Sequence, residues 1–317
     1  MTYIFLVLGF VLLIKGADFF VEGSSAVAKK LKVPSLIIGM TIVAMGTSLP
    51  ECAVSVTASI TNNNALAVSN VVGSNIFNLM VVCGACALFA PLAVQAGTLK
   101  KEFPFSILIG VLLLVLGYIG MEVGHVDGVI LLVLFAAFLF WMVQSAKKAR
   151  TAGAALEIEE EEEAEHLADL PVWKCIVYIV LGAAAIAFGG DFVVDSASEI
   201  AADFGLSQNL IGLTIVAMGT SLPELVTSIV AARKKEADMA LGNVIGSNIF
   251  NVLFVLGIAA TISPVAFIME NVIDIVILTV MSVVVLIFAW SKKQIGRVEG
   301  IVMLLAYAGY MVYICMR

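Results

Sequence analysis

The side chains best placed to do chemistry are two glutamates, Glu51 and Glu224, which lie inside long apolar stretches. An ionisable group is costly within a bilayer, and its presence there normally reflects a function. Lys15 could neutralise one carboxylate, but the matching position in the other half of the chain is Phe188, so one ion pair cannot account for both. The two glutamates are therefore the first candidates for a functional site.

Each glutamate ends the motif Gly-Thr-Ser-Leu-Pro-Glu. Because Pro50 and Pro223 have no N–H, the carbonyls of Gly46 and Gly219, four residues earlier, lose their helical donors. Such a break is tolerated where the freed groups face a cavity or find a partner, and a cation is one such partner. The helix face that carries the first glutamate also presents, at helical spacing, Ala44, Thr47 and Ser48.

A second motif, Gly-Ser-Asn-Ile-Phe-Asn, adds a hydroxyl and an amide four residues apart in each half of the chain. These pairs are Ser74 with Asn78 and Ser247 with Asn251. Together the motifs predict an all-oxygen site with two carboxylates. Ca²⁺ accepts about 6–8 oxygen ligands in flexible geometry, whereas Mg²⁺ loses its water reluctantly. Softer metals call for Cys or His, and neither occurs in the repeated motifs. Ca²⁺ and Na⁺ competing for one carboxylate pair would produce exchange.

Other polar residues of the apolar stretches allow two interpretations each. Four further asparagines recur, as hydrogen-bonding groups between helices or as ligands: Asn70, Asn75, Asn243 and Asn248. Ser55 and Ser228 follow each glutamate by one turn and could reach a peripheral ion. Asp18 and Asp191 suit capping or gating, and Lys15 either pairs with Asp18 or extends toward the membrane surface.

The elements that position these residues are transmembrane helices. The chain of 317 residues is 62% hydrophobic and only 13% charged, which is far from the composition of a soluble domain. A span needs about 20 mostly apolar residues, and helices satisfy their own backbone groups in lipid. We therefore expect an all-α membrane protein with ten spans, at 3–22, 35–60, 66–90, 103–121, 126–144, 172–192, 208–232, 238–263, 270–290 and 297–315.

The chain is an internal duplication. Residues 38–51 read IGMTIVAMGTSLPE and residues 211–224 read IGLTIVAMGTSLPE, and the same offset of 173 aligns NVVGSNIFN (70–78) with NVIGSNIFN (243–251). With five spans per half, the second half enters the membrane from the opposite side. Inverted repeats with broken helices are typical of secondary transporters, whose sites lie near the bilayer midplane. We predict two inverted five-helix repeats with proline-broken core helices, at 1–146 and 172–317, joined by a charged linker at 147–171.

The loop charges predict the orientation. With both termini outside, all basic residues except Lys15 and Arg317 lie in cytoplasmic loops, as the positive-inside rule requires. The linker is then cytoplasmic and the protein belongs in the cell membrane. The net charge of −7 arises from the acidic run at 157–169, while the membrane part is near neutral. Membrane lipid is the expected surrounding, and neither nucleic acid nor an obligate protein partner is indicated.

With both motifs duplicated, the chain resembles the calcium/cation antiporter superfamily, specifically the compact prokaryotic form of its sodium/calcium exchanger branch. The resemblance covers the whole chain. It implies that spans two, three, seven and eight form the core, and that spans one and six slide to give alternating access. It implies ion ligands at the two glutamates, at the hydroxyls and carbonyls of Thr47, Ser48, Thr220 and Ser221, at the backbone of Ala44 and Ala217, and at Ser74, Asn78, Ser247 and Asn251.

The resemblance has one departure. Well-known members carry Asp at one of the paired asparagine positions, but here Asn78 and Asn251 are both Asn. The site then holds two formal charges, which argues against K⁺ co-transport and leaves the exchange ratio open.

The expected function is Na⁺/Ca²⁺ antiport without a cofactor, with proton-coupled Ca²⁺ antiport as the alternative. An ion channel would need a continuous pore, whereas an inverted repeat with one midplane site favours a carrier. An intramembrane hydrolase is disfavoured, because the chain has no HExxH motif and its spans hold no Asp pair or Ser/His dyad. We therefore do not expect an enzyme.

Overall fold

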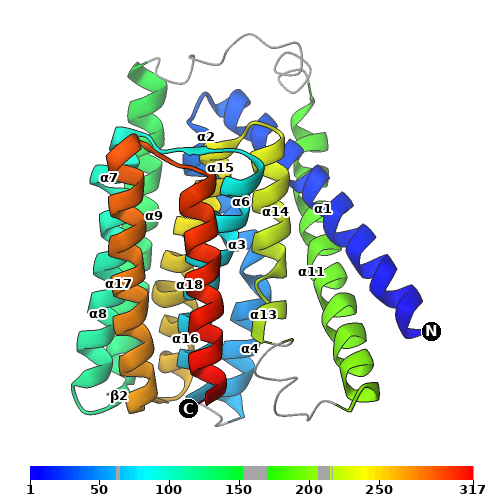
Figure 1. Cartoon of the computed structure of the whole chain (residues 1–317). Helices are drawn as coiled ribbons and strands as arrows, with labels where there is room; N and C mark the ends of the chain where they lie inside the picture. The colour runs from blue at the N-terminus through cyan, green and yellow to red at the C-terminus, as the bar shows by residue number, and fades with distance from the viewer. Residues whose placement is uncertain (62–64, 153–169, 206–214, 216, 317) are drawn as a thin grey trace.

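The computed structural model describes residues 1–61, 65–152, 170–205, 215 and 217–316, and these form a bundle of helices (Figure 1). Helices of the first half are α1 (Thr2–Leu31), α2 (Ser35–Ile38), α3 (Ala44–Thr47), α4 (Leu49–Ile60), α5 (Ala65–Phe77), α6 (Cys83–Phe89), α7 (Ala96–Lys100), α8 (Glu102–Tyr118) and α9 (His125–Ala152). Helices of the second half are α11 (Val172–Asp203), α13 (Ala217–Gly219), α14 (Leu222–Arg233), α15 (Ala237–Phe250), α16 (Leu256–Ile262), α17 (Met269–Lys292) and α18 (Arg297–Met316).

Short π-helical segments and strands complete the described fold. The π-helical segments are η1 (Gly39–Val43), η2 (Asn78–Val82) and η4 (Asn251–Val255). The strands are β1 (Leu92–Ala93), β2 (Glu122–Val123), β3 (Val265–Ala266) and β4 (Gln294–Ile295). β1 pairs with β4 and β2 with β3, both antiparallel, so each short sheet joins one half of the chain to the other.

Eight of the ten predicted spans coincide with described segments that are long and apolar enough to cross a membrane. Seven of these segments are single helices, and the eighth is the bent pair Ser35–Thr47 and Leu49–Ile60. The predicted span at 103–121 corresponds to α8, which has only 17 residues. The predicted span at 208–232 lies partly outside the described residues, and the acidic run of the linker lies entirely outside them. A multi-pass helical membrane protein is the result, and the count of ten stays a prediction.

The centre of the bundle consists of the segments that carry the repeated polar motif. Leu66–Phe89 and Ala237–Ile262 are each 78% buried over their most apolar stretch, compared with 17% for Arg297–Met316. Helices α2, α3 and η1 pack closely on α15, because glycines bring the backbones together. A Cβ on Gly242 would lie 2.5 Å from the Leu36 carbonyl oxygen, and one on Gly246 would lie 2.5 Å from the Met40 Cα. The first half is thereby held tightly against the second.

Helices α1 and α11 form a separate pair on one flank of the bundle (Figure 1). Their contact also depends on glycines, since a Cβ on Gly9 would lie 2.9 Å from the Gly189 carbonyl oxygen and one on Gly16 would lie 2.9 Å from that of Gly182. Small residues allow such close helix packing in lipid. The pair is thus one packed unit beside the core.

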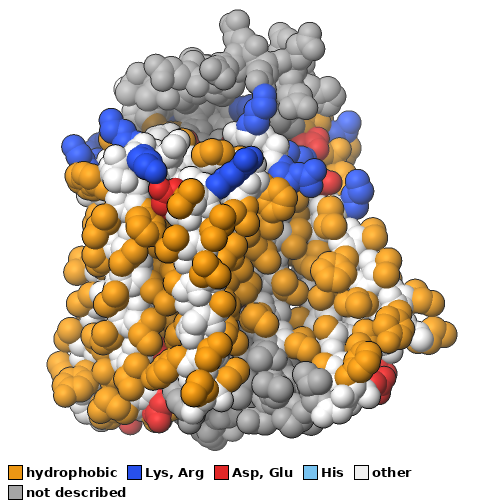
Figure 2. All heavy atoms as spheres, viewed as in Figure 1, with side chains coloured by type: hydrophobic (Ala, Val, Ile, Leu, Met, Phe, Trp, Pro, Cys, Tyr) orange, Lys and Arg blue, Asp and Glu red, His pale blue; other side chains and the backbone are white. Residues whose placement is uncertain are grey.

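The charged side chains are distributed unevenly over the visible surface. In Figure 2 the Lys and Arg side chains gather at the upper end of the molecule, and hydrophobic side chains cover the sides of the helices below them. An apolar belt with basic groups along one rim is the pattern expected of a protein embedded in a bilayer.

Candidate functional site

Each predicted helix break coincides with a serine of the first motif. In the first half, α3 ends at Thr47, Ser48 has φ −86° and ψ 14°, and α4 starts at Leu49 after a bend of 49°. In the second half, Ser221 has φ −93° and ψ 6° and α14 starts at Leu222. Each proline occupies the first turn of the new helix, where its missing N–H costs no helical hydrogen bond. The break therefore lies two residues before each proline.

The two glutamates lie in the first turns of α4 and α14. Unpaired backbone N–H groups make the start of a helix favourable for negative charge. Both side chains are completely buried. A sharp break in an apolar helix thus places each carboxylate at a helix start inside the protein.

The two broken helices exchange hydrogen bonds. Ser48 Oγ donates to Glu224 Oε1 at 2.7 Å, and Ser221 Oγ donates to Glu51 Oε1 at 3.0 Å. Each glutamate is therefore held by the serine of the other half. The remaining oxygen of each carboxylate, Oε2, is buried without a hydrogen-bond partner among the described residues.

The second motif adds further buried oxygens on helices that pack against α4 and α14, which carry the carboxylates. The Ser74 hydroxyl lies close to the Glu51 carboxylate, although no hydrogen bond of normal geometry joins them. The π-helical segments η2 and η4 begin at Asn78 and Asn251, and π-helical turns of this kind recur at functional sites. Several buried oxygens of the described residues lack partners, namely Ser74 Oγ, Asn78 Oδ1, Thr220 Oγ1 and Asn251 Oδ1, in addition to both glutamate Oε2 atoms.

An unpaired polar oxygen inside a protein costs free energy unless something satisfies it. Here the unpaired atoms are carboxylate, hydroxyl and amide oxygens, which are hard ligands that suit Ca²⁺ and Na⁺. No group of three or more His, Cys, Asp or Glu side chains that could hold a metal occurs in the described part of the chain. The arrangement fits a transient cation held by two carboxylates and neutral oxygens.

The asparagines with two possible roles all make hydrogen bonds between helices. Asn70 Nδ2 donates to Ser55 Oγ at 3.0 Å, and Asn243 Nδ2 donates to Ser228 Oγ at 2.9 Å. Asn75 Nδ2 donates to the Asn248 backbone carbonyl at 3.1 Å, and Asn248 Nδ2 donates to the Asn75 carbonyl at 3.2 Å. Their amide groups hold the core helices together, and Ser55 and Ser228 take part in these contacts.

The remaining sequence candidates are placed as follows. The Ala44 carbonyl already accepts from the Ser48 N–H at 3.1 Å, and Ala217 is the first residue of α13. Ser247 Oγ lies 3.5 Å from Asn243 Oδ1. Direct ligation by these three residues stays a prediction, as it does for every other candidate ligand.

Two contacts were not foreseen from the sequence. Thr47 Oγ1 donates to Asn243 Oδ1 at 3.1 Å and so links the two halves beside the carboxylates. Lys234 Nζ lies 3.6 Å from Asp18 Oδ1, although their positions are far apart in the chain. Hydrophobic periodicity carries no signal for either contact. The expected pairing of Lys15 with Asp18 does occur, with Lys15 Nζ 3.8 Å from Asp18 Oδ2.

The chain matches known proteins over nearly its whole length. The family model described as sodium/calcium exchanger protein matches residues 1–144 and 174–316, which leaves only the segment between the halves and the last residue unmatched. The chain is 36% identical over 321 residues to the inner membrane protein YrbG of Escherichia coli, an alignment that covers 98% of this chain and 95% of that protein.

Two further relatives carry explicit names. The sodium/calcium exchanger MaX1 of Methanosarcina acetivorans is 32% identical over 342 residues, which cover 98% of this chain and 97% of that protein. A solved structure of the sodium-calcium exchanger NCX_Mj, determined in a study of extracellular ion exchange, superposes with a TM-score of 0.84 at 31% identity, covering 99% of this chain and 98% of that one. Both likenesses extend over nearly the whole length of the partners.

Proposed function

Since the chain belongs to the sodium/calcium exchanger protein family, we propose that it exchanges Na⁺ for Ca²⁺ across the cell membrane by alternating access. A cation antiporter is the role that its membrane helices and its relatives support. The single observation that carries the proposal is the buried pair Glu51 and Glu224, each held by a serine of the other half and each with one oxygen unpaired.

The ligand set explains why these two cations would compete. Two carboxylates balance the charge of one Ca²⁺, and the surrounding hydroxyl and amide oxygens raise the number of ligands toward the range that Ca²⁺ prefers. Na⁺ accepts the same hard oxygens. We assign ion binding to Glu51 and Glu224 together with Thr47, Ser48, Thr220, Ser221, Ala44, Ala217, Ser74, Asn78, Ser247 and Asn251. Either cation occupies the carboxylate pair only when the other has left, and this competition is exchange.

The proposed topology is two inverted five-helix repeats, 1–146 and 172–317, with both termini outside and the linker at 147–171 in the cytoplasm. The gathering of Lys and Arg at one rim (Figure 2) supports a cytoplasmic assignment for that rim. The glycine-packed pair of α1 and α11 supports a movement of these two helices as one unit against the core. Such a movement would open the site to one face at a time.

We propose that the helices as arranged here leave the site open toward the outside and closed toward the cytoplasm. NCX_Mj, to which this chain is similar over nearly its whole length, was solved in connection with extracellular ion exchange. Helix α1 packs against α14, whose end carries Lys234, whereas α11 makes no comparable contact with α4 among the described residues, and this difference supports closure of the cytoplasmic side.

Proton coupling is the second candidate, because the site has two carboxylates and no third acid. Two protons would neutralise this pair as completely as one Ca²⁺. Glu51 and Glu224 would then bind H⁺ instead of Na⁺ on the return step.

Radioactive Ca²⁺ uptake into proteoliposomes separates the two candidates. Vesicles are loaded with Na⁺ and diluted into Na⁺-free buffer with the pH clamped on both sides. Uptake that disappears without the Na⁺ gradient is the expected result. Uptake that follows only an imposed pH gradient would replace Na⁺ coupling with proton coupling, and Ca²⁺ currents far above carrier turnover would contradict antiport altogether.

A further inference from the structure

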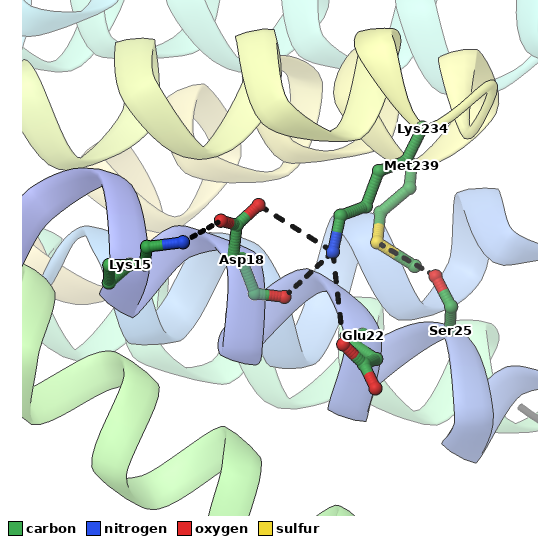
Figure 3. Close-up of polar contacts among 6 residues, drawn as sticks. All are labelled: Lys15, Asp18, Glu22, Ser25, Lys234 and Met239. Carbon is green, nitrogen blue, oxygen red and sulfur yellow. Dashed lines mark hydrogen bonds and ion pairs between the residues drawn. The ribbon is translucent and has the colours of Figure 1, made fainter.

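An ion-pair cluster connects α1 to the end of α14, away from the carboxylate site (Figure 3). Lys234 Nζ lies 3.6 Å from Asp18 Oδ1 and 3.9 Å from Glu22 Oε2, and it donates to the Asp18 backbone carbonyl at 3.2 Å. Lys15 Nζ lies 3.8 Å from Asp18 Oδ2, but it belongs to α1 itself. Lys234 is therefore the base that bridges the two helices in this cluster.

The same part of α1 also contacts the ion site. Phe20 lies between the two acidic residues in sequence, and its ring packs against the backbone of Gly46, where a Cβ would lie 2.6 Å from Phe20 Cζ. Gly46 directly precedes Thr47 in the broken helix. Farther along α1, Ser25 Oγ lies 4.0 Å from Met239 Sδ of α15 (Figure 3). A shift of α1 against the core must therefore disturb both the ion-pair cluster and the packing next to the site.

The corresponding part of the second half shows no such bridge among the described residues. At the offset of 173, Asp191 and Asp195 match the two acidic residues of α1, but Thr61 takes the place of Lys234. The Thr61 hydroxyl donates to the Thr57 carbonyl of its own helix, at 2.9 Å. The two acidic pairs are alike, whereas within the described part of the chain a base ties only the acidic pair of α1 to the core.

We propose that Lys234 determines the sidedness of transport, by bridging α1 to α14 in the arrangement that is closed to the cytoplasm and not in the opposite one. This inference rests on the proposed alternating access through movement of α1 and α11, and on the proposed outward facing of the present arrangement. The end of α14 that carries Lys234 also carries Arg233, and we have assigned the Lys- and Arg-rich rim to the cytoplasm. The bridge therefore lies at the closed end of the bundle.

The bridge acts through the population of the two arrangements. A contact present in only one arrangement stabilises that arrangement over the other. A cation arriving from the cytoplasm binds only the open fraction, so its apparent affinity falls in proportion to that fraction. Because the side chains of Lys234, Asp18 and Glu22 are 37%, 35% and 29% exposed, water screens the pairs and the effect is modest. Ion pairs of this kind correspond to about a two- to fivefold shift in an equilibrium.

The test compares Lys234→Gln with Lys15→Gln in proteoliposomes of defined orientation. Both changes remove one positive charge near the Asp18 carboxylate, but only the first removes the link between helices. We expect Lys234→Gln to raise the apparent Ca²⁺ affinity at the cytoplasmic face about two- to fivefold relative to the outer face. Lys15→Gln should keep the ratio of the unmodified protein. Equal ratios for both variants would overturn the proposal.

A second measurement follows the helices without transport. Hydrogen–deuterium exchange in Ca²⁺-free detergent should show faster uptake at the ends of α1 and α14 in Lys234→Gln and unchanged uptake in Lys15→Gln. The double variant Asp18→Asn with Glu22→Gln removes both carboxylates that face Lys234, and it should change the affinity ratio and the exchange as Lys234→Gln does. If this double variant behaved like Lys15→Gln, the bridge would not be the cause.

Failure of this inference can be distinguished from failure of the proposed function. If the unmodified protein exchanges Na⁺ for Ca²⁺ but Lys234→Gln matches Lys15→Gln in both measurements, only the role of Lys234 is wrong. If the unmodified protein shows no Na⁺-driven uptake, the proposed function is wrong, and the exchange of backbone hydrogens still decides whether the bridge holds α1 to α14.

Discussion

In one half of the chain Thr47 donates to Asn243, and in the other the matching hydroxyl of Thr220 has no partner among the described residues. The asparagines of the second motif also differ between the halves, but here the bonded side chain belongs to the second half. Asn251 Nδ2 donates to Asn75 Oδ1 at 3.2 Å, whereas Asn78 Nδ2 and Asn248 Oδ1, which would make the matching bond, are both unpaired within the described part of the chain. The carboxylate contacts show no such difference, since each serine donates to the opposite glutamate.

This comparison separates two kinds of contact around one site. The serine–glutamate bonds obey the repeat and hold the two charges in equivalent positions. The threonine hydroxyl is bonded to the other half in the first repeat and unpaired in the second, whereas the asparagine amide is bonded in the second repeat, at Asn251, and unpaired in the first, at Asn78, among the described residues. Asn251 Oδ1 and the Oε2 atoms of both glutamates are unpaired as well among the described residues, so both halves offer oxygens to a cation.

The strongest challenge to the equivalent contacts is to neutralise the carboxylates one at a time. Glu51→Gln and Glu224→Gln should each lower the rate of Ca²⁺ exchange by at least about a hundredfold, because a buried cation then loses half of its compensating charge. The shape of the side chain is kept, so the thermal unfolding of the purified protein should change little. Normal exchange by either variant would remove that glutamate from the site, and a large difference between them would break the equivalence.

Removal of the two serine hydroxyls tests the same equivalence with a smaller expected effect. Ser48→Ala and Ser221→Ala each delete one hydrogen bond to a buried carboxylate, which corresponds to about a tenfold loss of Ca²⁺ affinity. Titration calorimetry on the detergent-solubilised protein measures both affinities. We expect values that agree within about threefold of each other. If only one variant lost affinity, the reciprocal bonds would not contribute equally.

Substitutions of Asn78 and Asn251 test the contacts in which the two halves differ. Asn78→Ala removes an amide that has no hydrogen bond among the described residues, so it should weaken Ca²⁺ binding with little change in stability. Asn251→Ala also removes the bond to Asn75 and should lower the free energy of unfolding by about 1 kcal/mol. Thermal unfolding without Ca²⁺ provides the measurement, with each variant as the control for the other. Equal stabilities would mean that the Asn251–Asn75 bond contributes nothing.

The two halves also differ in how they would accept an aspartate in place of Asn78 or Asn251, the residue that well-known exchangers carry at one of these positions. Asn251→Asp would bring two oxygen acceptors together, because Asn75 Oδ1 already faces the Asn251 amide. Asn78→Asp would meet no such conflict among the described residues. A third carboxylate is therefore accommodated more readily at Asn78 than at Asn251.

Much of the fold and of the candidate site could be predicted from the amino-acid sequence alone. The apolar stretches determined a helical membrane protein, since lipid leaves helices as the way to pair backbone groups. The offset of 173 identified the duplicated motifs, and Pro50 and Pro223 located the helix breaks to within two residues. Charge in an apolar span marked Glu51 and Glu224 as the candidates, because burial of a lone carboxylate needs a reason.

Only the tertiary structure decided which groups meet. Ser48 reaches Glu224 across 176 positions and Lys234 bridges to Asp18 across 216, and nothing local to either segment requires these contacts. Two near-identical motifs also differ in which oxygens they leave unpaired, because neighbours from the other half, such as Asn243 beside Thr47, set each hydrogen bond. Helical periodicity encodes the faces that each segment presents, whereas packing between distant segments selects the partners that those faces find.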